Sequence, residues 1–180
     1  MLAAFIAGPA FGAAVKAKIT ALKGDVKVKA TASASWSAAK QGDTLSEGAA
    51  VKCGTDSEAF IAWGKGNVLK VGAISSVTIS NLSEEKDSSI SKVTLDSGKV
   101  FAKSGKISKN STFEVKTPTA VAGVRGTGFE ATPNSIAVVE GTVAVSAGGK
   151  EIEVGAGMMT EIPGVGEPPA EPAPIPPDML

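Results

Sequence analysis

Apolar and polar residues alternate along most of the middle of this 180-residue chain. A period of two places successive side chains on opposite faces of a β-strand, so the pattern predicts short half-buried strands. The clearest runs are Val26–Val28, Phe113–Val115, Val143–Val145 and Ile152–Val154, and similar runs occupy Ala59–Trp63, Val68–Val71, Val77–Ile79, Val93–Leu95, Lys99–Lys103 and Ile136–Val139.

Turn-forming residues separate these runs at short intervals. They include Gly42–Asp43, Gly54–Asp56, Gly64–Asn67, Ser97–Gly98, Pro133–Asn134 and Gly148–Gly149. About a dozen short strands at such spacing predict an all-β fold, either a sandwich or a roll of jelly-roll type, with a short β-solenoid as the alternative. The polar segment Leu82–Ser91 interrupts the pattern, and we expect it to form a loop or a single helical turn.

The first fourteen residues are uncharged and apolar, and they are interrupted by Gly8, Pro9 and Gly12. A membrane-spanning helix needs about 20 apolar residues, so this stretch better fits the apolar region of a secretory signal that ends before Val15. The usual positive region of a signal is missing, and an apolar N-terminus of a cytosolic protein is the alternative. We expect the mature chain to be extracytoplasmic (periplasmic, cell-surface or secreted), with no integral membrane segment.

Residues 163–180 contain seven of the ten prolines and only acidic charges. Proline lacks a backbone donor, so we expect this acidic tail to stay out of the sheets and to extend as a polyproline II spacer or a disordered end. Docking of the tail to a partner is the alternative. The predicted organisation is a signal over residues 1–14, a β domain over 15–162 and the tail over 163–180.

Composition excludes several chemistries. The chain has 18 basic and 18 acidic residues, one cysteine and no histidine. Without histidine, neither Ser-His-Asp nor Cys-His machinery can form, and a zinc site lacks ligands. The zero formal charge argues against a nucleic-acid partner. Carboxylates such as Asp43, Asp56, Glu58 and Glu140 are not spaced as a catalytic pair. We therefore expect no enzyme activity, no metal and no cofactor.

Three large or reactive side chains have two interpretations each. Cys53 has no partner for an internal disulfide, so it is either a buried apolar residue or the site of an intermolecular disulfide. Trp63 lies in a strand-like run and is expected in the core, whereas Trp36 lies among Ser and Ala residues and can be exposed or cap the core. A carbohydrate-binding role for Trp36 or Trp63 is the alternative.

Residues 117–130 contain the single arginine of the chain, Arg125, against seventeen lysines. The rigid guanidinium fork binds several oxygens at once, which lysine cannot do. We expect Arg125 to be partly buried and to bind backbone carbonyls, Glu130 or Glu140, with capture of an anionic ligand as the alternative. Glycines would let the chain bend or pass close to another strand. The proposed structural motif consists of Pro118, Gly123, Val124, Arg125, Gly126, Thr127, Phe129, Glu140 and Gly141.

This segment, TPTAVAGVRGTGFE, is followed by VVEGTV at Val138–Val143 and by VGAG at Val154–Gly157. Together with GDTL at Gly42–Leu45, these motifs resemble the FecR domain family, and the resemblance covers roughly Lys16 to Ile162. It implies an all-β extracytoplasmic module without catalysis. In iron-uptake regulators of the family, the domain follows a membrane helix and a cytoplasmic anti-sigma segment. Here only the apolar leader precedes it, so we expect a stand-alone exported form.

These observations favour a protein–protein interaction module that binds an envelope or surface protein. The first alternative is self-assembly into a fibre or surface layer, because unpaired strand edges are templates for pairing. The second is either envelope signalling in sigma-factor regulation or the binding of carbohydrate.

Overall fold

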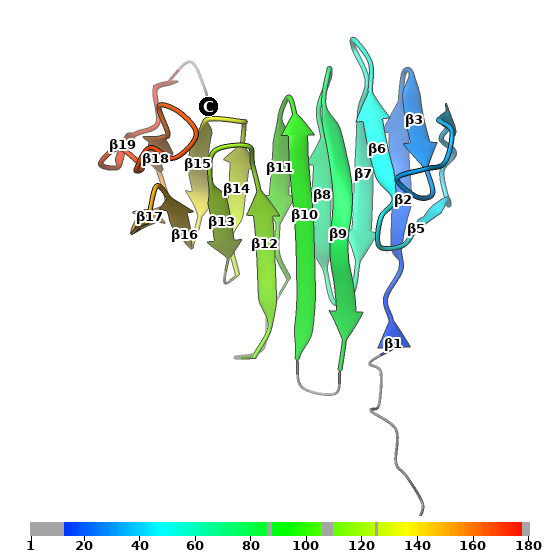
Figure 1. Cartoon of the computed structure of the whole chain (residues 1–180), viewed down its shortest axis with the longest axis horizontal. Coiled ribbons are helices and arrows are strands. Elements are labelled where there is room, and N and C mark those ends of the chain that lie inside the picture. Colours follow the sequence, from blue (N-terminus) through cyan, green and yellow to red (C-terminus); the bar gives the residue numbers. More distant parts are fainter. Residues whose placement is uncertain (1–12, 86–87, 106–109, 125, 178–180) are drawn as a thin grey trace, which may run out of the picture.

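A computed structural model describes residues 13–85, 88–105, 110–124 and 126–177. The described residues form two β-sheets that face each other as a sandwich (Figure 1). Sheet A contains, in spatial order, β17 (Lys150–Gly155), β16 (Thr142–Ala147), β13 (Val121–Val124), β12 (Thr112–Lys116), β10 (Ser89–Ser97), β9 (Ser76–Glu84), β6 (Ala50–Cys53), β3 (Val26–Lys29) and β4 (Ser37–Ala38), with β1 (Ala13–Ala14) also pairing with β9. Sheet B contains β19 (Ala173–Pro174), β18 (Met158–Glu161), β15 (Ser135–Glu140), β14 (Gly128–Ala131), β11 (Val100–Lys103), β8 (Asn67–Val71), β7 (Glu58–Trp63), β2 (Ala17–Lys23) and β5 (Thr44–Leu45).

In both sheets, strands from the first part of the chain lie at one end and strands from the last part lie at the other. Successive hairpins alternate between the sheets: β7–β8 lie in sheet B, β9–β10 in sheet A, β14–β15 in sheet B and β16–β17 in sheet A. The colours of Figure 1 therefore run from blue at one end of the sandwich to red at the other. Pairing is antiparallel except between β10 and β12, because β11 crosses to sheet B between these two strands.

The predicted all-β sandwich is confirmed, and the described strands form neither a solenoid nor a closed barrel. Each run named from its alternation lies in a strand, except that Lys99 of the run Lys99–Lys103 precedes β11. The number of strands, 19 in the described residues, exceeds the prediction. The additional strands include β1, β4, β5 and β19, which have two residues each and are too short to show a periodic pattern.

The core lies between the two sheets and takes the inward side chains of the longer strands. Trp63 is 5% exposed, its ring meets Phe113 edge to face at 5.5 Å, and its indole N–H donates to Ser91 Oγ at 2.9 Å. Trp63 is therefore a core residue, and its alternative role as a carbohydrate-binding side chain is wrong. Cys53 is 1% exposed, and burial, helped by the charge of Glu58, raises the pKa of its thiol to about 11.

The segment Leu82–Ser91 was predicted to be a loop or a helical turn, and this is wrong for most of it. β9 continues to Glu84, β10 begins at Ser89, and these two residues pair. The inward positions here are Leu82 and Ser91. Ser91 is buried because it accepts the hydrogen bond of Trp63, so a polar residue stands where the pattern would need an apolar one.

The tail was expected not to pair with a sheet, and this is also wrong. Ala173 and Pro174 pair with Met159 and Met158 of β18. Tail residues other than proline donate backbone hydrogen bonds along this edge: Ala170 N–H donates to Glu161 O and Ile175 N–H to Gly157 O, both at 2.9 Å. Proline is compatible with an edge strand because its missing donor faces away from the sheet.

Most of the predicted signal, residues 1–12, lies outside the described residues, whereas Ala13 pairs with Glu84 and Ala14 with Ser83 of β9. Among the described residues, no helix is long and apolar enough to cross a membrane.

Candidate interaction surface

The segment with the single arginine connects the two sheets, because it leads from β13 in sheet A to β14 in sheet B. Arg125 itself lies outside the described residues, so its role as an internal clamp stays a prediction. Its neighbours Val124 and Phe129 are buried in the core. The backbone of Thr127 is tied to Ser104 in both directions: Thr127 N–H donates to Ser104 Oγ at 3.1 Å, and Ser104 N–H to Thr127 O at 3.0 Å.

The structure also places three other residues of the proposed motif, Gly141, Pro118 and Gly123. Gly141 has a φ of 80°, and a Cβ at this position would lie 2.5 Å from Thr127 Cγ2, so glycine is required there. Pro118 is exposed after β12, and Gly123 pairs with Glu114 and Ala144 within sheet A. The carboxylates predicted as partners of the arginine both bind lysines: Glu130 binds Lys99 at 3.0 Å, and Glu140 binds Lys103 at 3.4 Å.

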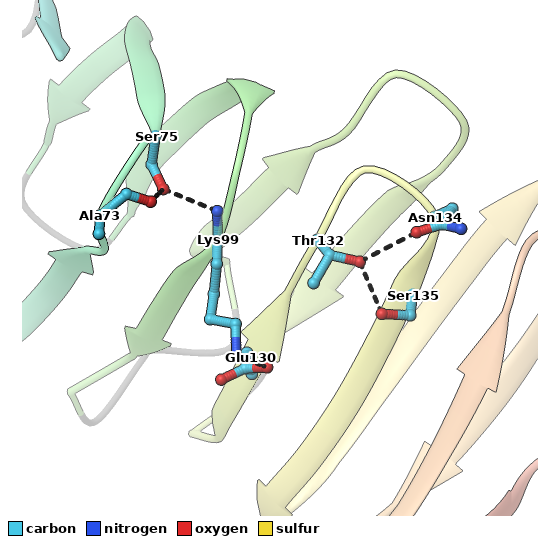
Figure 2. Close-up of polar contacts among 7 residues, drawn as sticks. All are labelled: Ala73, Ser75, Lys99, Glu130, Thr132, Asn134 and Ser135. Carbon is cyan, nitrogen blue, oxygen red and sulfur yellow. Dashed lines mark hydrogen bonds and ion pairs between the residues drawn. The ribbon is translucent and has the colours of Figure 1, made fainter. Parts of the chain in front are cut away.

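A serine anchors the turn that precedes β11 and a second serine anchors the turn that precedes β3. Ser75 Oγ accepts the backbone N–H of Lys99 at 2.8 Å and donates to Ala73 O at 3.0 Å (Figure 2). Ser57 Oγ accepts Asp25 N–H and donates to Thr55 O in the same way, both at 2.9 Å. These bonds fix the loops that connect the sheets at this end of the strands.

The outer face of sheet B carries aromatic and charged side chains in one row. Strand register aligns Phe60, Lys70, Phe101, Glu130 and Ala137, which come from β7, β8, β11, β14 and β15. The Lys70 ammonium lies 5.5 Å from the centre of the Phe60 ring. This row therefore combines apolar contact area with charges, an arrangement typical of protein-binding surfaces.

A pocket of about 540 Å³ lies on this face. Two ion pairs line it. Lys70 binds Glu58 at 2.8 Å. Lys99 binds Glu130 at 3.0 Å, and Figure 2 shows these two residues. The hydrogen bond from Lys70 lowers the pKa of Glu58, so this carboxyl is ionised at neutral pH. The lining residues are Lys23, Asp56, Ser57, Glu58, Lys70, Gly72, Ala73, Lys99, Phe101 and Glu130.

Two residues with unusual backbone conformations lie beside this pocket. Among the described residues, Asp56 and Ile74 are the non-glycine residues with positive φ, at 51° and 53°. Asp56 lines the pocket, and Ile74 follows the lining residue Ala73. Their loops are joined, because Ile74 N–H donates to Gly54 O at 3.0 Å. A positive φ is rare for a β-branched residue, and Ile74 is also 68% exposed.

Of the sequence-predicted binding residues, Trp36 remains on the surface. It is 40% exposed, and the Lys29 ammonium lies 5.1 Å from the centre of its ring. Sequence reasoning missed Phe101, which lies at an outward strand position, and Ile74, for which no sequence signal exists: the run Val71–Ser75 resembles a strand with one glycine.

Comparison with known proteins identifies related folds. Two crystal structures of a proposed anti-sigma factor from Parabacteroides distasonis ATCC 8503 each match with a TM-score of 0.59 and 14% sequence identity, over 69% of this chain and 59% of that protein. The chain thus spans less than two thirds of the protein it matches, and identity this low shows a shared fold only. No curated protein matches the sequence.

The model of the family described as FecR protein matches residues 49–144, which include the pocket-forming strands β7, β8, β11 and β14 as well as the arginine segment. This is the family that the motifs around Arg125 had indicated. Since the match covers more than half of the chain, the protein belongs to the FecR family.

Proposed function

We propose that this FecR domain is a non-enzymatic, extracytoplasmic component of envelope signalling that binds another protein through the pocket on sheet B and the adjacent Ile74 loop. The observation that carries the proposal is Ile74, a large apolar side chain that is 68% exposed on a left-handed backbone. Strained backbone persists where the surrounding structure enforces it, and such residues cluster at functional sites.

The loop that presents Ile74 is rigidly held. Its serine, Ser75, is 1% exposed and binds the backbone on both sides. A Cβ at Gly98 would lie 2.6 Å from Ile74 O, so the neighbouring turn packs tightly against the loop. A fixed loop loses little conformational entropy when a partner binds, which makes an exposed isoleucine on it a suitable anchor.

The chemistry of the pocket supports a protein partner rather than a substrate. Four of its charged groups already form two ion pairs, and Phe101 contributes a partly buried aromatic surface between them. An apolar centre surrounded by charged groups resembles the core and rim of a protein interface. Ile74 would fill a pocket of the partner while the ion pairs set its orientation.

Membership of the FecR family supports a signalling role for this binding. The fold shared with the proposed anti-sigma factor of Parabacteroides distasonis is consistent with regulation of transcription through a protein contact. The apolar, uncharged residues that precede the domain support export.

Site-specific photo-cross-linking tests the proposal. A photoreactive amino acid replaces Ile74 in one variant and Ile90 in a matched control, because Ile90 is also exposed, at 40%, but lies in β10 of sheet A. We expect one envelope protein of the source organism to be captured from position 74 and not from position 90. Equal capture at both positions, or capture at position 90 alone, would contradict the proposed surface.

A further inference from the structure

The sandwich protects its sheet edges in different ways. An unprotected edge strand pairs with other chains, and proteins prevent this with very short strands, charges or a covering segment. In the described residues, the edge strands β4 and β5 have two residues each. The edge strand β17 carries Lys150, Glu151 and Glu153, all of them exposed. Three of the edges are therefore protected by their own sequence.

The strand β18 has no such protection of its own. Its sequence is Met-Met-Thr-Glu, with one charge, at Glu161, and no lysine or proline. The tail covers this edge instead, through the pairing of Ala173 and Pro174 with Met159 and Met158. Figure 1 shows the tail folded back beside β18 at the C-terminal end of the sandwich. In the described structure, the tail thus stands where a further strand of sheet B would be added.

Two apolar residues of the tail are buried, Pro169 and, near the end of the tail, Ile175. Ile175 is 8% exposed and packs with Ala137 and Met159 in a cluster separate from the main core. Ala137 and Met159 pair with each other and continue the row on the outer face of sheet B. Polar contacts add to this packing: Thr160 Oγ1 donates to Ala170 O at 2.7 Å, and Lys150 binds Glu171 at 2.9 Å through exposed side chains.

We infer that residues 163–177 are a releasable cap on β18, anchored by Ile175, and that the strand which replaces the cap is β18 of a second copy of this chain. β18 already pairs in the antiparallel direction with both β15 and β19. Two identical edges can pair in this direction about a twofold axis. If this pair is centred on Met159, the apolar surfaces of Ala137 and Met159, which release of the tail exposes, come together in the two copies. The formal charge of zero leaves no net repulsion between copies.

The full chain with Ile175→Asp tests this inference. Val165→Asp is the matched control, since Val165 lies in the same tail but is 81% exposed. Hydrogen exchange reports whether the amides of Ala170 and Ile175 lose protection, which indicates release of the tail. Light scattering coupled to size exclusion reports the mass. We expect the wild type and Val165→Asp to be monomeric with a protected tail, and Ile175→Asp to lose protection and double its mass as concentration rises.

A second variant locates the new contact. Met159→Lys added to Ile175→Asp places a charge on the freed edge, which blocks strand addition, so we expect the monomer to return. The inference is wrong if Ile175→Asp leaves the tail protected, if the tail is released but the mass stays monomeric, or if the dimer persists in the double variant. A wild type that is already dimeric with a protected tail would overturn it as well.

Discussion

The loop that carries Ile74 makes an unusual prediction about stability: replacing this isoleucine with glycine leaves the fold almost as stable as before. Burying an isoleucine fully contributes about 1.5–3 kcal/mol, and Ile74 is 68% exposed, so the substitution removes about 1 kcal/mol of apolar contact. The greater backbone freedom of glycine in the unfolded state further lowers the free energy of unfolding, by about 0.5–1 kcal/mol. Relief of the left-handed backbone, with φ at 53°, returns about 1–2 kcal/mol. The net change is within about 1 kcal/mol of zero.

Ile90→Gly is the matched comparison because Ile90 is 40% exposed and lies within β10, where its backbone has no positive φ. This substitution removes about 1–2 kcal/mol of burial and about 1 kcal/mol of strand preference, with no strain to relieve. We expect Ile90→Gly to lower the free energy of unfolding by about 2–3 kcal/mol. Urea denaturation of both variants measures the difference. A loss at Ile74→Gly as large as that at Ile90→Gly would refute the strain argument.

Three further predictions concern buried groups. The unfolded-state thiol of Cys53, with its ordinary pKa of 9.0, releases its proton before the native thiol, with its pKa of about 11. The free energy of unfolding of the wild type, measured relative to that of Cys53→Ala, should therefore be constant below pH 9. It should fall by about 2–3 kcal/mol as the pH rises to 11, which chemical denaturation across this range measures. Trp63→Phe leaves the hydroxyl of Ser91 buried without its donor, so it should cost about 2–4 kcal/mol in chemical denaturation, and adding Ser91→Ala should recover about 1 kcal/mol. Ser75→Ala removes the buried acceptor of Lys99 N–H and should cost about 1–3 kcal/mol in thermal melts, whereas Ser80→Ala at an exposed position should change stability by less than about 0.5 kcal/mol.

Alternation along the chain predicted the strands because burial on one face of a sheet imposes a period of two. Phe113–Val115 and Val93–Leu95 are typical, since their buried residues are apolar and the residue between them, Glu114 or Thr94, is polar. Prediction failed where a single contact overrides polarity: Ser91 is buried because it accepts a hydrogen bond from Trp63, which lies 28 residues earlier in the chain. The pairing of the tail was missed for a related reason. Its prolines indicate an extended segment, but only the three-dimensional position of Met159 provides the surface for Ile175.

For the candidate site as well, the sequence predicted one part and missed another. The motifs around Arg125 indicated the family, because glycines and small residues are required where the chain crosses between sheets, as at Gly141. They did not indicate the pocket, whose lining comes from strands that become neighbours only after folding. Lys70 and Glu58 meet through the β7–β8 hairpin, and Lys99 and Glu130 through the pairing of neighbouring strands. The positive φ of Ile74 depends on a turn that alternation does not encode.

The most direct test of the binding surface is the affinity for the partner that is cross-linked at position 74. Titration calorimetry with this purified partner would compare the wild type with Ile74→Asp and with Ile90→Asp on the opposite sheet. An anchor residue at an interface contributes about 2 kcal/mol or more, so we predict that Ile74→Asp raises the Kd at least about 30-fold while Ile90→Asp changes it less than about twofold. An unchanged Kd for Ile74→Asp, or an equal loss in both variants, would contradict the account.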